Sequence, residues 1–498
     1  MSSFASNFTT LIVDIGDVLF SWSSQTNTSI SPKALRRILF SPTWNDYERG
    51  RISQAECYAR VGGEFSVDPA EVGRAFQEAS DSLQPNEELI SVIRQLKVRS
   101  NGTLHVFAMS NISTPDYEIL RTKPIDWSLF DDIFTSAGVG DRKPNLGFYK
   151  VVLARTGADP SRTIFVDDKI DNVLSARSLG MHGIIFDDHR KVVRALYNLL
   201  GDPVERGRQY LTLNAKKHLS VTENGIVLRE NFAQLLILEA TDDRNLVNLT
   251  DTLRTWHFFQ DNTEEYPFDL DTTSIGLTVV RNPEDVAHSI MDDMLDYIDD
   301  DGIIQIYFDH HRPRFDPIVC VNVLTLFYSY GRGHQLDRTL QWIREVLLHR
   351  AYLDGTRYYE TPECFLYFIG RLLKISNDGY LAIHIKPLLI ERVQERIGAE
   401  GDAMALSMRL CLCAYLGLRN NVDFRTLLSL QCEDGGWEIG WVYKYPSSGV
   451  KIGNRGLTTS LAVKAILEMQ RFPSPPPTPS MAPAIPSSNK LIPLPNLL

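Results

Sequence analysis

The sequence predicts a multidomain protein in which an N-terminal α/β domain is followed by an all-helical domain. Three observations carry this prediction. The first part alternates short apolar strands with helical stretches, which is typical of a parallel sheet covered by helices. In the second part, apolar residues recur every three or four positions, which is the helical period. The 498 residues also exceed the size of one ordinary hydrophobic core, so two or three domains are expected.

Composition excludes several classes of partner. The net charge is -11 and no basic block is present, so nucleic acid is not an expected partner. No uncharged apolar run reaches the roughly 18 residues of a membrane span, so stable membrane insertion is not expected either. Six scattered cysteines and a start without a secretory signal favour free thiols in the cytoplasm.

In the first part, polar residues stand where predicted strands and helices meet. An apolar strand from Thr10 ends at Asp14, and another ends at Ser110. Lys143 precedes a predicted helix, and a further strand ends at the paired acids Asp167 and Asp168. Because parallel α/β sheets bind ligands at the carboxyl ends of their strands, these side chains are expected to share one site.

This order of motifs, over about residues 8–190, resembles the haloacid dehalogenase (HAD) phosphatase superfamily. The helical insert at about 22–85 resembles the small cap of that superfamily. The resemblance implies that Asp14 attacks phosphorus and that Ser110 and Lys143 neutralise the phosphoryl oxygens. It also implies a Mg²⁺ site formed by Asp14, the Gly16 carbonyl, Asp167 and Asp168, since oxygen ligands suit this ion.

Gly16 departs from the HAD pattern, which usually has a second aspartate as general acid at this position. The next aspartate, Asp17, stands one position after the place of this general acid. General acid help is typically worth about 10²–10⁴-fold in rate. Any activity is therefore expected to favour a good leaving group, so a diphosphate should be cut more easily than the final monoester. A retained sheet without chemistry is the alternative.

The predicted domains are 1–190 for the α/β part, 191–230 for a linker, 231–472 for the helical part and 473–498 for a tail. Gly201-Asp202-Pro203 breaks the helical connector that leaves the sheet. The tail is rich in proline, which lacks an amide donor and favours extended chain, so no domain is expected there.

The helical part contains Phe268-Asp-Leu-Asp-Thr-Thr-Ser274. An Asp-x-Asp pair can hold a divalent metal, or one carboxyl group can stay protonated and donate a proton. A helix N-terminus with acids near its positive end is the purely structural interpretation. The motif resembles the Asp-x-Asp-Thr-Thr motif of class II terpene cyclases. A second segment, Gln431 to Trp437, resembles the Gln-Trp repeat that braces the α/α-barrel domains of those enzymes.

Together, a HAD-like part followed by a cyclase part resembles the fungal drimane-type sesquiterpene synthases. The resemblance implies that farnesyl diphosphate is cyclised to a bicyclic drimenyl or albicanyl diphosphate. By the motif match, Asp271 is the proton donor, supported by Asp269 and Thr272, although the two aspartates could exchange roles. A free aspartate has a pKa near 3.9, so the donor must be buried to stay neutral.

The remaining substrate contacts are predicted by residue type. Aromatic faces stabilise carbocations without acting as bases, and cations bind a diphosphate. The aromatic candidates are Trp256, Phe259, Tyr307, Tyr358, Tyr359, Trp437, Trp441 and Tyr443. The cationic candidates are Arg312, Arg314, Lys444, Lys451 and Arg455. The final base is left open between His310, His311 and water.

Three functions remain in competition. The first is a bifunctional enzyme that cyclises a prenyl diphosphate and then removes its phosphates. The second is a cyclase alone, with a structural HAD-like domain, and the third is a phosphatase with a helical binding module. A homo-oligomer is left open.

Overall fold

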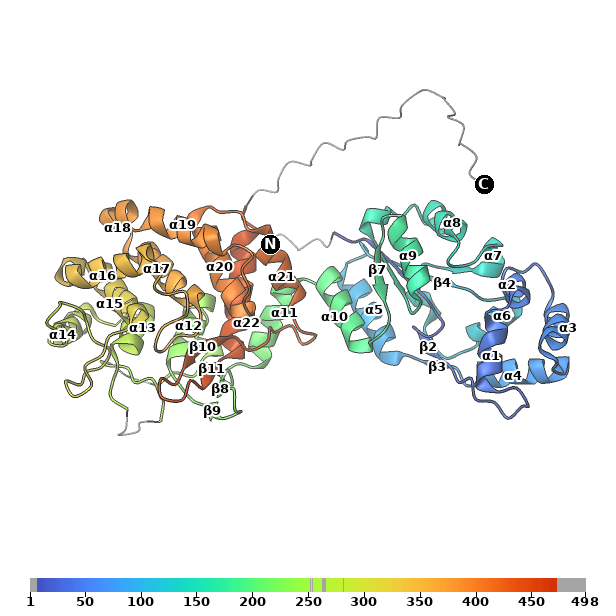
Figure 1. Ribbon diagram of the computed structural model, residues 1–498, viewed down its shortest axis with the longest axis horizontal. Helices are drawn as coiled ribbons and strands as arrows, with labels where there is room; N and C mark the ends of the chain where they lie inside the picture. The colour runs from blue at the N-terminus through green and yellow to red at the C-terminus, as the bar shows by residue number, and fades with distance from the viewer. Residues whose placement is uncertain (1–6, 251, 253, 262–265, 281, 473–498) are drawn as a thin grey trace, which may run out of the picture.

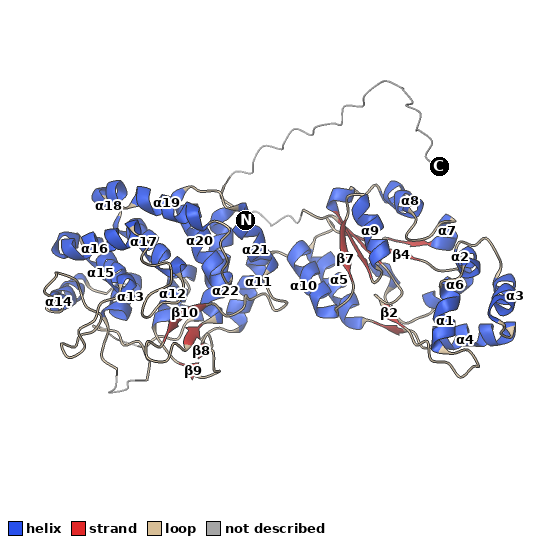
Figure 2. Ribbon diagram, viewed as in Figure 1, coloured by secondary structure: helices blue, strands red, loops and turns tan. Residues whose placement is uncertain are grey.

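The structure is a computed structural model that describes residues 7–250, 252, 254–261, 266–280 and 282–472. The proline-rich tail predicted at 473–498 lies outside the described residues. Two lobes lie side by side, one built on a parallel sheet and one almost entirely helical (Figure 1). The strands described in the helical lobe are short and lie together near one end (Figure 2). The predicted fold class, α/β followed by all-helical, is confirmed.

A five-stranded parallel sheet forms the centre of the first lobe, in the order β5-β4-β1-β6-β7. The central strand β1 pairs with β4 on one side and with β6 on the other. Consequently the residues that follow these three strands meet at one edge. The strands are β1 (Thr10–Val13), β4 (His105–Ser110), β5 (Asp132–Thr135), β6 (Thr163–Asp167) and β7 (His182–Ile185).

Helices cover both faces of this sheet. One apolar core joins it to α5 and α10, and a second joins it to α8 and α9. Both faces are therefore buried, as the apolar strands require. The helices of this layer and the loops around it are α5 (Glu87–Arg99), α6 (Thr114–Arg121), α7 (Ser136–Val139), α8 (Leu146–Thr156), α9 (Ile170–Ser178) and α10 (His189–Leu200).

A small helical cap is inserted between β2 (Phe20–Ser21) and β3 (Gln84–Pro85), which pair antiparallel. Each of its four helices begins at a serine or aspartate whose side chain accepts a backbone N–H bond, the usual N-cap. The cap has its own apolar core around Trp44. Its helices are α1 (Pro32–Leu39), α2 (Pro42–Glu48), α3 (Gln54–Phe65) and α4 (Pro69–Asp81).

Six inner helices form a closed ring in the second lobe, because α12, α13, α15, α17, α20 and α22 each contact the next and α22 returns to α12. These helices are buried on most of their surface, as expected for the inner layer of an α/α barrel. Their bounds are α12 (Phe232–Thr241), α13 (Leu270–Val280), α15 (Pro317–Ser329), α17 (Pro362–Ser376), α20 (Ala403–Leu416) and α22 (Arg455–Met469).

The other helices of this lobe lie outside the ring (Figure 1). They are α11 (Pro203–Leu213), α14 (Glu284–Leu295), α16 (Asp337–Leu348), α18 (Gly379–His384), α19 (Lys386–Arg396) and α21 (Asn421–Ser429). No helix among the described residues has both the length and the apolar character needed to cross a membrane.

Residues 191–230, predicted as a linker, are largely structured. Helix α11 packs on α22, and the strands of this segment join a small sheet in the order β10-β11-β8-β9. The bounds are β8 (Ser220–Thr222), β9 (Val227–Leu228), β10 (Trp441–Lys444) and β11 (Lys451–Gly453). The domain boundaries themselves stay a prediction.

The two lobes meet where α10 approaches the segment after α21. Arg194 donates to the backbone carbonyls of Leu430 and Gln431, at 2.7 and 2.9 Å. Arg206 donates to the Gln431 side chain at 3.0 Å and to the Cys432 carbonyl at 2.6 Å. The predicted Gln-Trp segment therefore connects the helical lobe to the chain that leaves the sheet.

Candidate active sites

Asp271 lies in the first turn of α13, inside the helical ring. Its surroundings are fixed by the backbone, since Leu270 donates to the Ile306 carbonyl at 2.7 Å and Asp269 forms a β-bridge with Tyr307. Asp271 is only 8% exposed. An acid placed so deep in an apolar lobe is strongly desolvated, which favours its neutral form.

Two neutral side chains hold the Asp271 carboxyl group. Asn322 of α15 donates to Oδ1 at 2.7 Å, and the Tyr359 hydroxyl donates to Oδ2 at 2.5 Å. Burial raises the pKa of Asp271 to about 8, and the charge of Asp269 adds to this rise, while the two hydrogen bonds oppose it. At neutral pH Asp271 is therefore mainly protonated, as a proton donor must be.

Asp269 differs from Asp271 in its hydrogen bonds. Its Oδ1 accepts the backbone N–H of Thr272 at 2.5 Å, so it caps the start of α13. Burial raises the pKa of Asp269 to about 6, and the bond from Thr272 limits the rise. Since its pKa is the lower of the two, Asp269 is the more readily ionised member of the pair. This order favours Asp271 as the donor.

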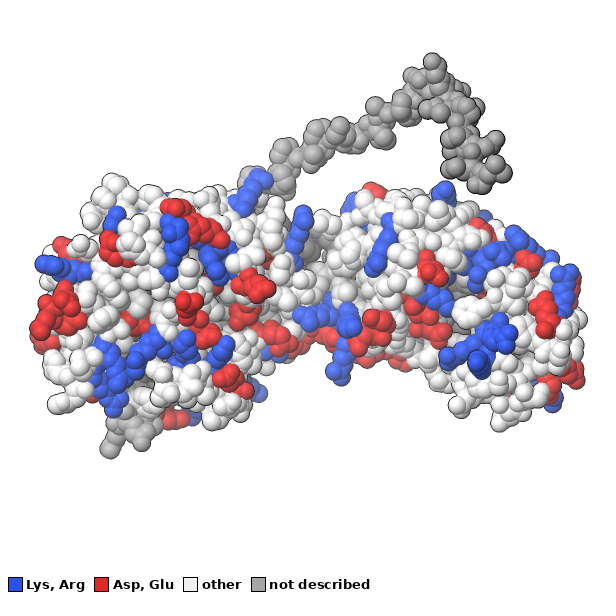
Figure 3. Space-filling view, viewed as in Figure 1, with Lys and Arg blue, Asp and Glu red and all other residues white. Residues whose placement is uncertain are grey.

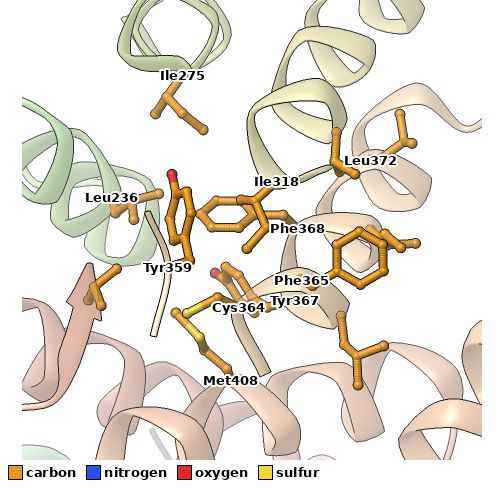
Figure 4. Close-up of a cluster of buried hydrophobic side chains, with 14 of the residues drawn as sticks. Leu236, Ile275, Ile318, Tyr359, Cys364, Phe365, Tyr367, Phe368, Leu372 and Met408 are labelled. Carbon is orange, nitrogen blue, oxygen red and sulfur yellow. The ribbon is translucent and has the colours of Figure 1, made fainter. Parts of the chain in front are cut away.

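Aromatic rings surround the Tyr359 side chain. Phe232, Phe368 and Tyr443 each present an edge or face to it, with ring centroids 5.9–6.2 Å apart. Figure 4 shows the Tyr359 ring among buried apolar side chains, with its hydroxyl pointing toward Ile275 of α13. Ring faces beside the acid are what a carbocation requires.

Polar side chains gather next to these rings. The Tyr307 hydroxyl donates to that of Tyr358 at 3.2 Å, and the Arg357 guanidinium lies 5.9 Å from the Tyr358 ring centroid. A hydrogen bond with Tyr358 raises the pKa of Arg314. Both arginines are exposed, and lysines and arginines form a band across the lower part of this lobe (Figure 3). Arg314 and Arg357 therefore offer positive charge near the acid.

Each of the other predicted cations contacts an acidic side chain. Arg312 lies 3.4 Å from Asp309. Lys444 and Lys451 both contact Glu360, at 3.3 and 2.6 Å, directly after Tyr359. Arg455 forms two hydrogen bonds with Asp434, at 2.8 and 2.9 Å.

Trp437 serves as a brace in the structure. Its side chain is fully buried, and its Nε1 donates to the Leu427 carbonyl at 2.8 Å. Its own carbonyl accepts from Arg455 at 2.9 Å. Gln431 donates to the carbonyls of Pro203 and Gly435. These contacts join α11, α21 and α22, so we leave Trp437 and Arg455 out of the proposed diphosphate site.

The remaining predicted aromatic and basic candidates divide by position. Trp256 lies against α13, where its backbone N–H donates to Thr273 Oγ1 at 3.0 Å. Phe259 contacts Phe258 and Tyr266 at the edge of the lobe. His310 stacks on Tyr297 at 4.5 Å, and His311 is exposed. Trp441 belongs to β10.

The second site lies at the carboxyl edge of the parallel sheet. The Lys143 ammonium contacts Asp14 Oδ1 and Asp167 Oδ2, both at 2.7 Å, and donates to the Met109 carbonyl at 2.8 Å. Ser110 ends β4, the neighbour of β1. The structure thus brings together the residues that the sequence places at separate strand ends.

Charge inside this site is balanced by Lys143. Burial raises the pKa of Asp14 to about 7, and the lysine opposes this rise. Burial also disfavours the charged form of Lys143, but the two carboxylates outweigh this effect and raise its pKa. Asp167 is held further by Asn172 at 2.8 Å.

The acids of this site fit a magnesium ion. Ligand oxygens of Asp14, Asp167 and Asp168 lie within 4.8 Å of one another. Asp168 Oδ1 is buried without a hydrogen-bond partner among the described residues, and three carboxylates form a hard oxygen site. The predicted Mg²⁺ ligands, including the Gly16 carbonyl, remain a proposal.

Gly16 leaves open space at this site. A Cβ built there meets no atom within 4 Å. Asp17 adopts φ 59, and its Oδ2 accepts from Trp22 Nε1 at 3.3 Å. Asp17 is therefore directed to the start of the cap, and Gly16 itself carries no acid.

Comparison with known proteins covers both lobes. Residues 28–180 match the haloacid dehalogenase-like hydrolase family, and residues 204–330 match the sesquiterpene cyclase astC-like C-terminal domain. Drimenol cyclase drtB of Aspergillus calidoustus is 46% identical over 92% of this chain and 87% of its own. The chain belongs to the fungal drimane-type sesquiterpene synthases.

Two further matches each cover about two fifths of this chain. Sesquiterpene phosphatase astK of Aspergillus oryzae is 38% identical over 39% of this chain and 97% of its own. A predicted HAD-like family hydrolase from Porphyromonas gingivalis has 22% identity and a TM-score of 0.32, over 40% of this chain and 100% of that one.

Several residues near Asp271 carry no clear signal in the sequence. Asn322 lies in an apolar helix without any motif, although an asparagine in such a run is a signal of a buried hydrogen bond. The sequence predicts Phe232 and Phe368 only as ordinary residues of the hydrophobic core. The sequence predicts Tyr359 only as an aromatic surface and does not single out Arg357 beside it.

Proposed function

We propose that this protein is a class II sesquiterpene cyclase that also removes the phosphates of its product. Farnesyl diphosphate would be cyclised to drimenyl or albicanyl diphosphate and then hydrolysed to the alcohol. One observation carries this proposal: Asp271 is buried and held by Asn322 and Tyr359 beside a cluster of aromatic rings.

In the cyclase step, Asp271 transfers its proton to the terminal double bond of the substrate. The other double bonds close two rings, and a proton is lost from the resulting cation, so that the reaction is a net isomerisation. The Asp271 carboxylate that forms keeps its hydrogen bonds from Asn322 and Tyr359, which stabilise the charge. Solvent then returns the proton, and the base stays open between water, His310 and His311.

In the hydrolytic step, an oxygen of Asp14 attacks the terminal phosphorus and displaces the remaining phosphate ester. Lys143 and Ser110 neutralise the phosphoryl oxygens, and water then releases phosphate from Asp14. A bound Mg²⁺ would supply positive charge beside Asp14 and Asp168. A second cycle on the monophosphate releases the alcohol, and the leaving oxygen takes its proton from water, because Gly16 carries no acid.

The two alternatives differ in what happens to phosphate. A cyclase alone would keep the diphosphate, and a phosphatase with a helical binding module would make only linear farnesol. The relative from Aspergillus calidoustus is named for an alcohol, and the acids and lysine of the first lobe are all in place. These observations support the bifunctional enzyme.

Incubation with farnesyl diphosphate and Mg²⁺ tests the proposal, with Asp271→Asn and Asp14→Asn in parallel. The wild type should form a free bicyclic alcohol. Asp14→Asn should form the bicyclic diphosphate, detected as alcohol only after a phosphatase is added. Asp271→Asn should form no bicyclic product. A bicyclic product from Asp271→Asn would contradict the proposed acid.

The remaining assignments are part of the same proposal. Arg314 and Arg357, with Lys444 and Lys451, would hold the diphosphate beside Tyr358 and Tyr359.

A further inference from the structure

One arginine crosses the inside of the helical ring. Arg371 of α17 is only 6% exposed, and its Nε donates to Glu239 Oε1 of α12 at 2.7 Å. Its Nη2 donates to Thr278 Oγ1 of α13 at 2.5 Å. In the ring order α12, α13, α15, α17, α20 and α22, α12 lies opposite α17. The Arg371 side chain therefore spans the interior instead of joining two adjacent helices.

Arg371 lies at a different level of the ring from the proposed acid. Asp271 is in the first turn of α13, and Thr278 follows it by seven positions on the same helix. With a rise of about 1.5 Å per residue, Thr278 is about 10 Å further along α13. The Asp271 carboxyl group and the Arg371 guanidinium therefore mark two levels of one interior.

The Arg371 guanidinium has a donor to spare. Its Nη1 is buried and has no hydrogen-bond partner among the residues that the structure describes. Polar groups buried to this extent nearly always have a partner, either in the protein or in bound water. Nη1 therefore indicates a bound molecule that accepts a hydrogen bond.

Charged side chains lead from Arg371 toward the surface along two helices. Lys374 follows Arg371 by three residues on α17, and Glu468 follows Lys464 by four residues on α22. Each pair therefore shares one face of its helix. The two faces meet, because Lys374 Nζ lies 3.5 Å from Glu468 Oε1. The α17–α22 cluster is the name used below for Glu239, Arg371, Lys374, Lys464, Glu468 and Arg471.

A hollow of about 250 Å³ opens at the outer end of this cluster. The volume corresponds to about eight water molecules at ~30 Å³ each, which is enough for a hydrated phosphate or diphosphate group. Arg371 and Lys464 each lie about one helical turn inward from a residue of its wall. The wall consists of Lys374, Ala414, Tyr415, Glu468, Arg471 and Phe472.

Positive charge exceeds negative charge in the α17–α22 cluster, which has two acids and four cations. The Tyr367 hydroxyl and the acids of the cluster raise the pKa of Lys464, while burial opposes this rise. Lys464 is therefore charged at neutral pH. Because charges taken out of water are normally paired, the excess of cations favours an anionic ligand.

We propose that the α17–α22 cluster binds a phosphate or diphosphate group, with Arg371 Nη1 and the Lys464 ammonium as donors. Guanidinium and ammonium groups form strong, charge-assisted hydrogen bonds with phosphate oxygens. Glu239 contacts Nε of Arg371 and Glu468 contacts Lys374, so neither of these contacts uses Nη1. This site is separate from the phosphoryl site of the first lobe.

Two sources of the phosphate group share this chemistry. One is the head group of a prenyl diphosphate whose hydrocarbon lies in the ring toward Asp271, about 10 Å away. This source rests on the proposed cyclase function. The other source is inorganic phosphate or diphosphate from solution, which requires no cyclase activity.

Calorimetric titration with inorganic diphosphate tests the site, on the full chain with Asp14→Asn and without divalent metal. Lys464→Met removes the ammonium group and should raise the Kd for diphosphate by about tenfold or more. Lys464→Arg keeps the charge and should stay within about threefold of the parent. Arg344→Met removes a partly exposed cation of α16, outside the cluster, and should leave the Kd unchanged.

A second variant decides the question if Lys464→Met does not fold. Arg371→Met with Glu239→Gln removes both partners of the ion pair, so neither charge is left buried alone. It should also raise the Kd for diphosphate by about tenfold or more. Thermal melting followed by circular dichroism shows which variants are folded.

Cyclisation of farnesyl diphosphate by the same variants separates the two sources. If the head group binds in the cluster instead of beside Tyr358, Lys464→Met should raise the KM by about tenfold and change kcat less than about twofold. Inorganic diphosphate should then compete with the substrate. If the cluster takes only the free anion, the KM should stay unchanged while the Kd for diphosphate rises.

The site is refuted if both cluster variants bind diphosphate as tightly as the parent, or if the parent binds none. An equal loss of binding in Arg344→Met would also refute it, because the effect would then reflect only the net charge of the chain. A parent that binds diphosphate but forms no bicyclic product contradicts the proposed cyclase and leaves the site standing.

Discussion

Replacement of Tyr359 by phenylalanine is the sharpest test of the cyclase acid. The Tyr359 hydroxyl donates to Asp271 Oδ2 at 2.5 Å, while its ring contacts Phe232 and Phe368. Phenylalanine keeps the ring and removes only the donor. The substitution therefore probes the protonation of Asp271 with little change in the apolar packing.

The direction of the pKa change depends on whether the Tyr359 hydrogen bond stabilises the charged or the neutral form of Asp271. The donated hydrogen bond stabilises the carboxylate and so lowers the pKa of Asp271, which burial raises to about 8. A hydrogen bond to a charged group is worth about 1.5–3 kcal/mol. One pKa unit corresponds to about 1.4 kcal/mol, so the loss should raise the pKa of Asp271 by about 1–2 units.

The assay is the pH dependence of cyclisation in an Asp14→Asn background, where the bicyclic diphosphate accumulates. Because the protonated form is active, the wild-type rate should fall as pH rises through about 8. In Tyr359→Phe this fall should move up by about 1–2 pH units. The maximal rate should drop by roughly three- to tenfold, since a weaker acid gives up its proton more slowly.

Tyr352→Phe is the matched control, because Tyr352 is a buried tyrosine of the same lobe that stacks on Phe365 at 4.9 Å. It should leave the pH profile unchanged. A profile of Tyr359→Phe that coincides with the wild type, or that moves to lower pH, would refute the proposed role of the hydroxyl in setting the acidity of Asp271.

Four other predictions follow from the two sites. Asp269→Asn removes the negative charge that helps raise the pKa of Asp271, so the fall in cyclisation rate should move to lower pH in the same assay. Gly16→Asp places a carboxyl group where a Cβ meets no atom within 4 Å, and kcat for farnesyl monophosphate should rise by about tenfold or more; unchanged turnover would show that Gly16 does not limit this step. Chelation of divalent metal should halt phosphate release, and added Mg²⁺ should restore it, because the Asp14, Asp167 and Asp168 oxygens are gathered for a cation. Gly276→Ala should lower the thermal unfolding temperature of the helical lobe by overpacking that costs about 1–3 kcal/mol, because the new Cβ would lie 2.3 Å from Trp256 Nε1.

The sheet site was readable from the sequence because each of its parts ends an element. Asp14, Ser110 and Asp167 close apolar strands, and parallel strands bring their carboxyl ends to one edge. Lys143 carried a similar local signal, a lysine before a helix. Local sequence patterns are enough to predict a site when the sheet topology brings the patterned residues together.

The helical site was only partly readable, because its partners come from separate helices. Asp271 and Asp269 belong to one motif, but Asn322 and Tyr359 lie 51 and 88 residues from Asp271. Neither belongs to a local pattern, and only the closure of the ring of helices brings them to the acid. Conversely, the sequence predicts Arg455 as a diphosphate ligand, but its guanidinium forms an ion pair with Asp434. Sequence spacing does not show which charge already has a partner.

The two sites differ in the charge that lies beside a buried aspartate. Asp14 and Asp271 are both buried and burial raises the pKa of both. Lys143 lies 2.7 Å from Asp14, which favours the carboxylate needed for attack on phosphorus. Asp271 has only an amide and a phenol as partners, and the nearby Asp269 raises its pKa further. A cation beside Asp271 would favour its carboxylate, so this residue could no longer donate a proton. Loss of Lys143 would favour the protonated form of Asp14, so this residue could no longer attack phosphorus.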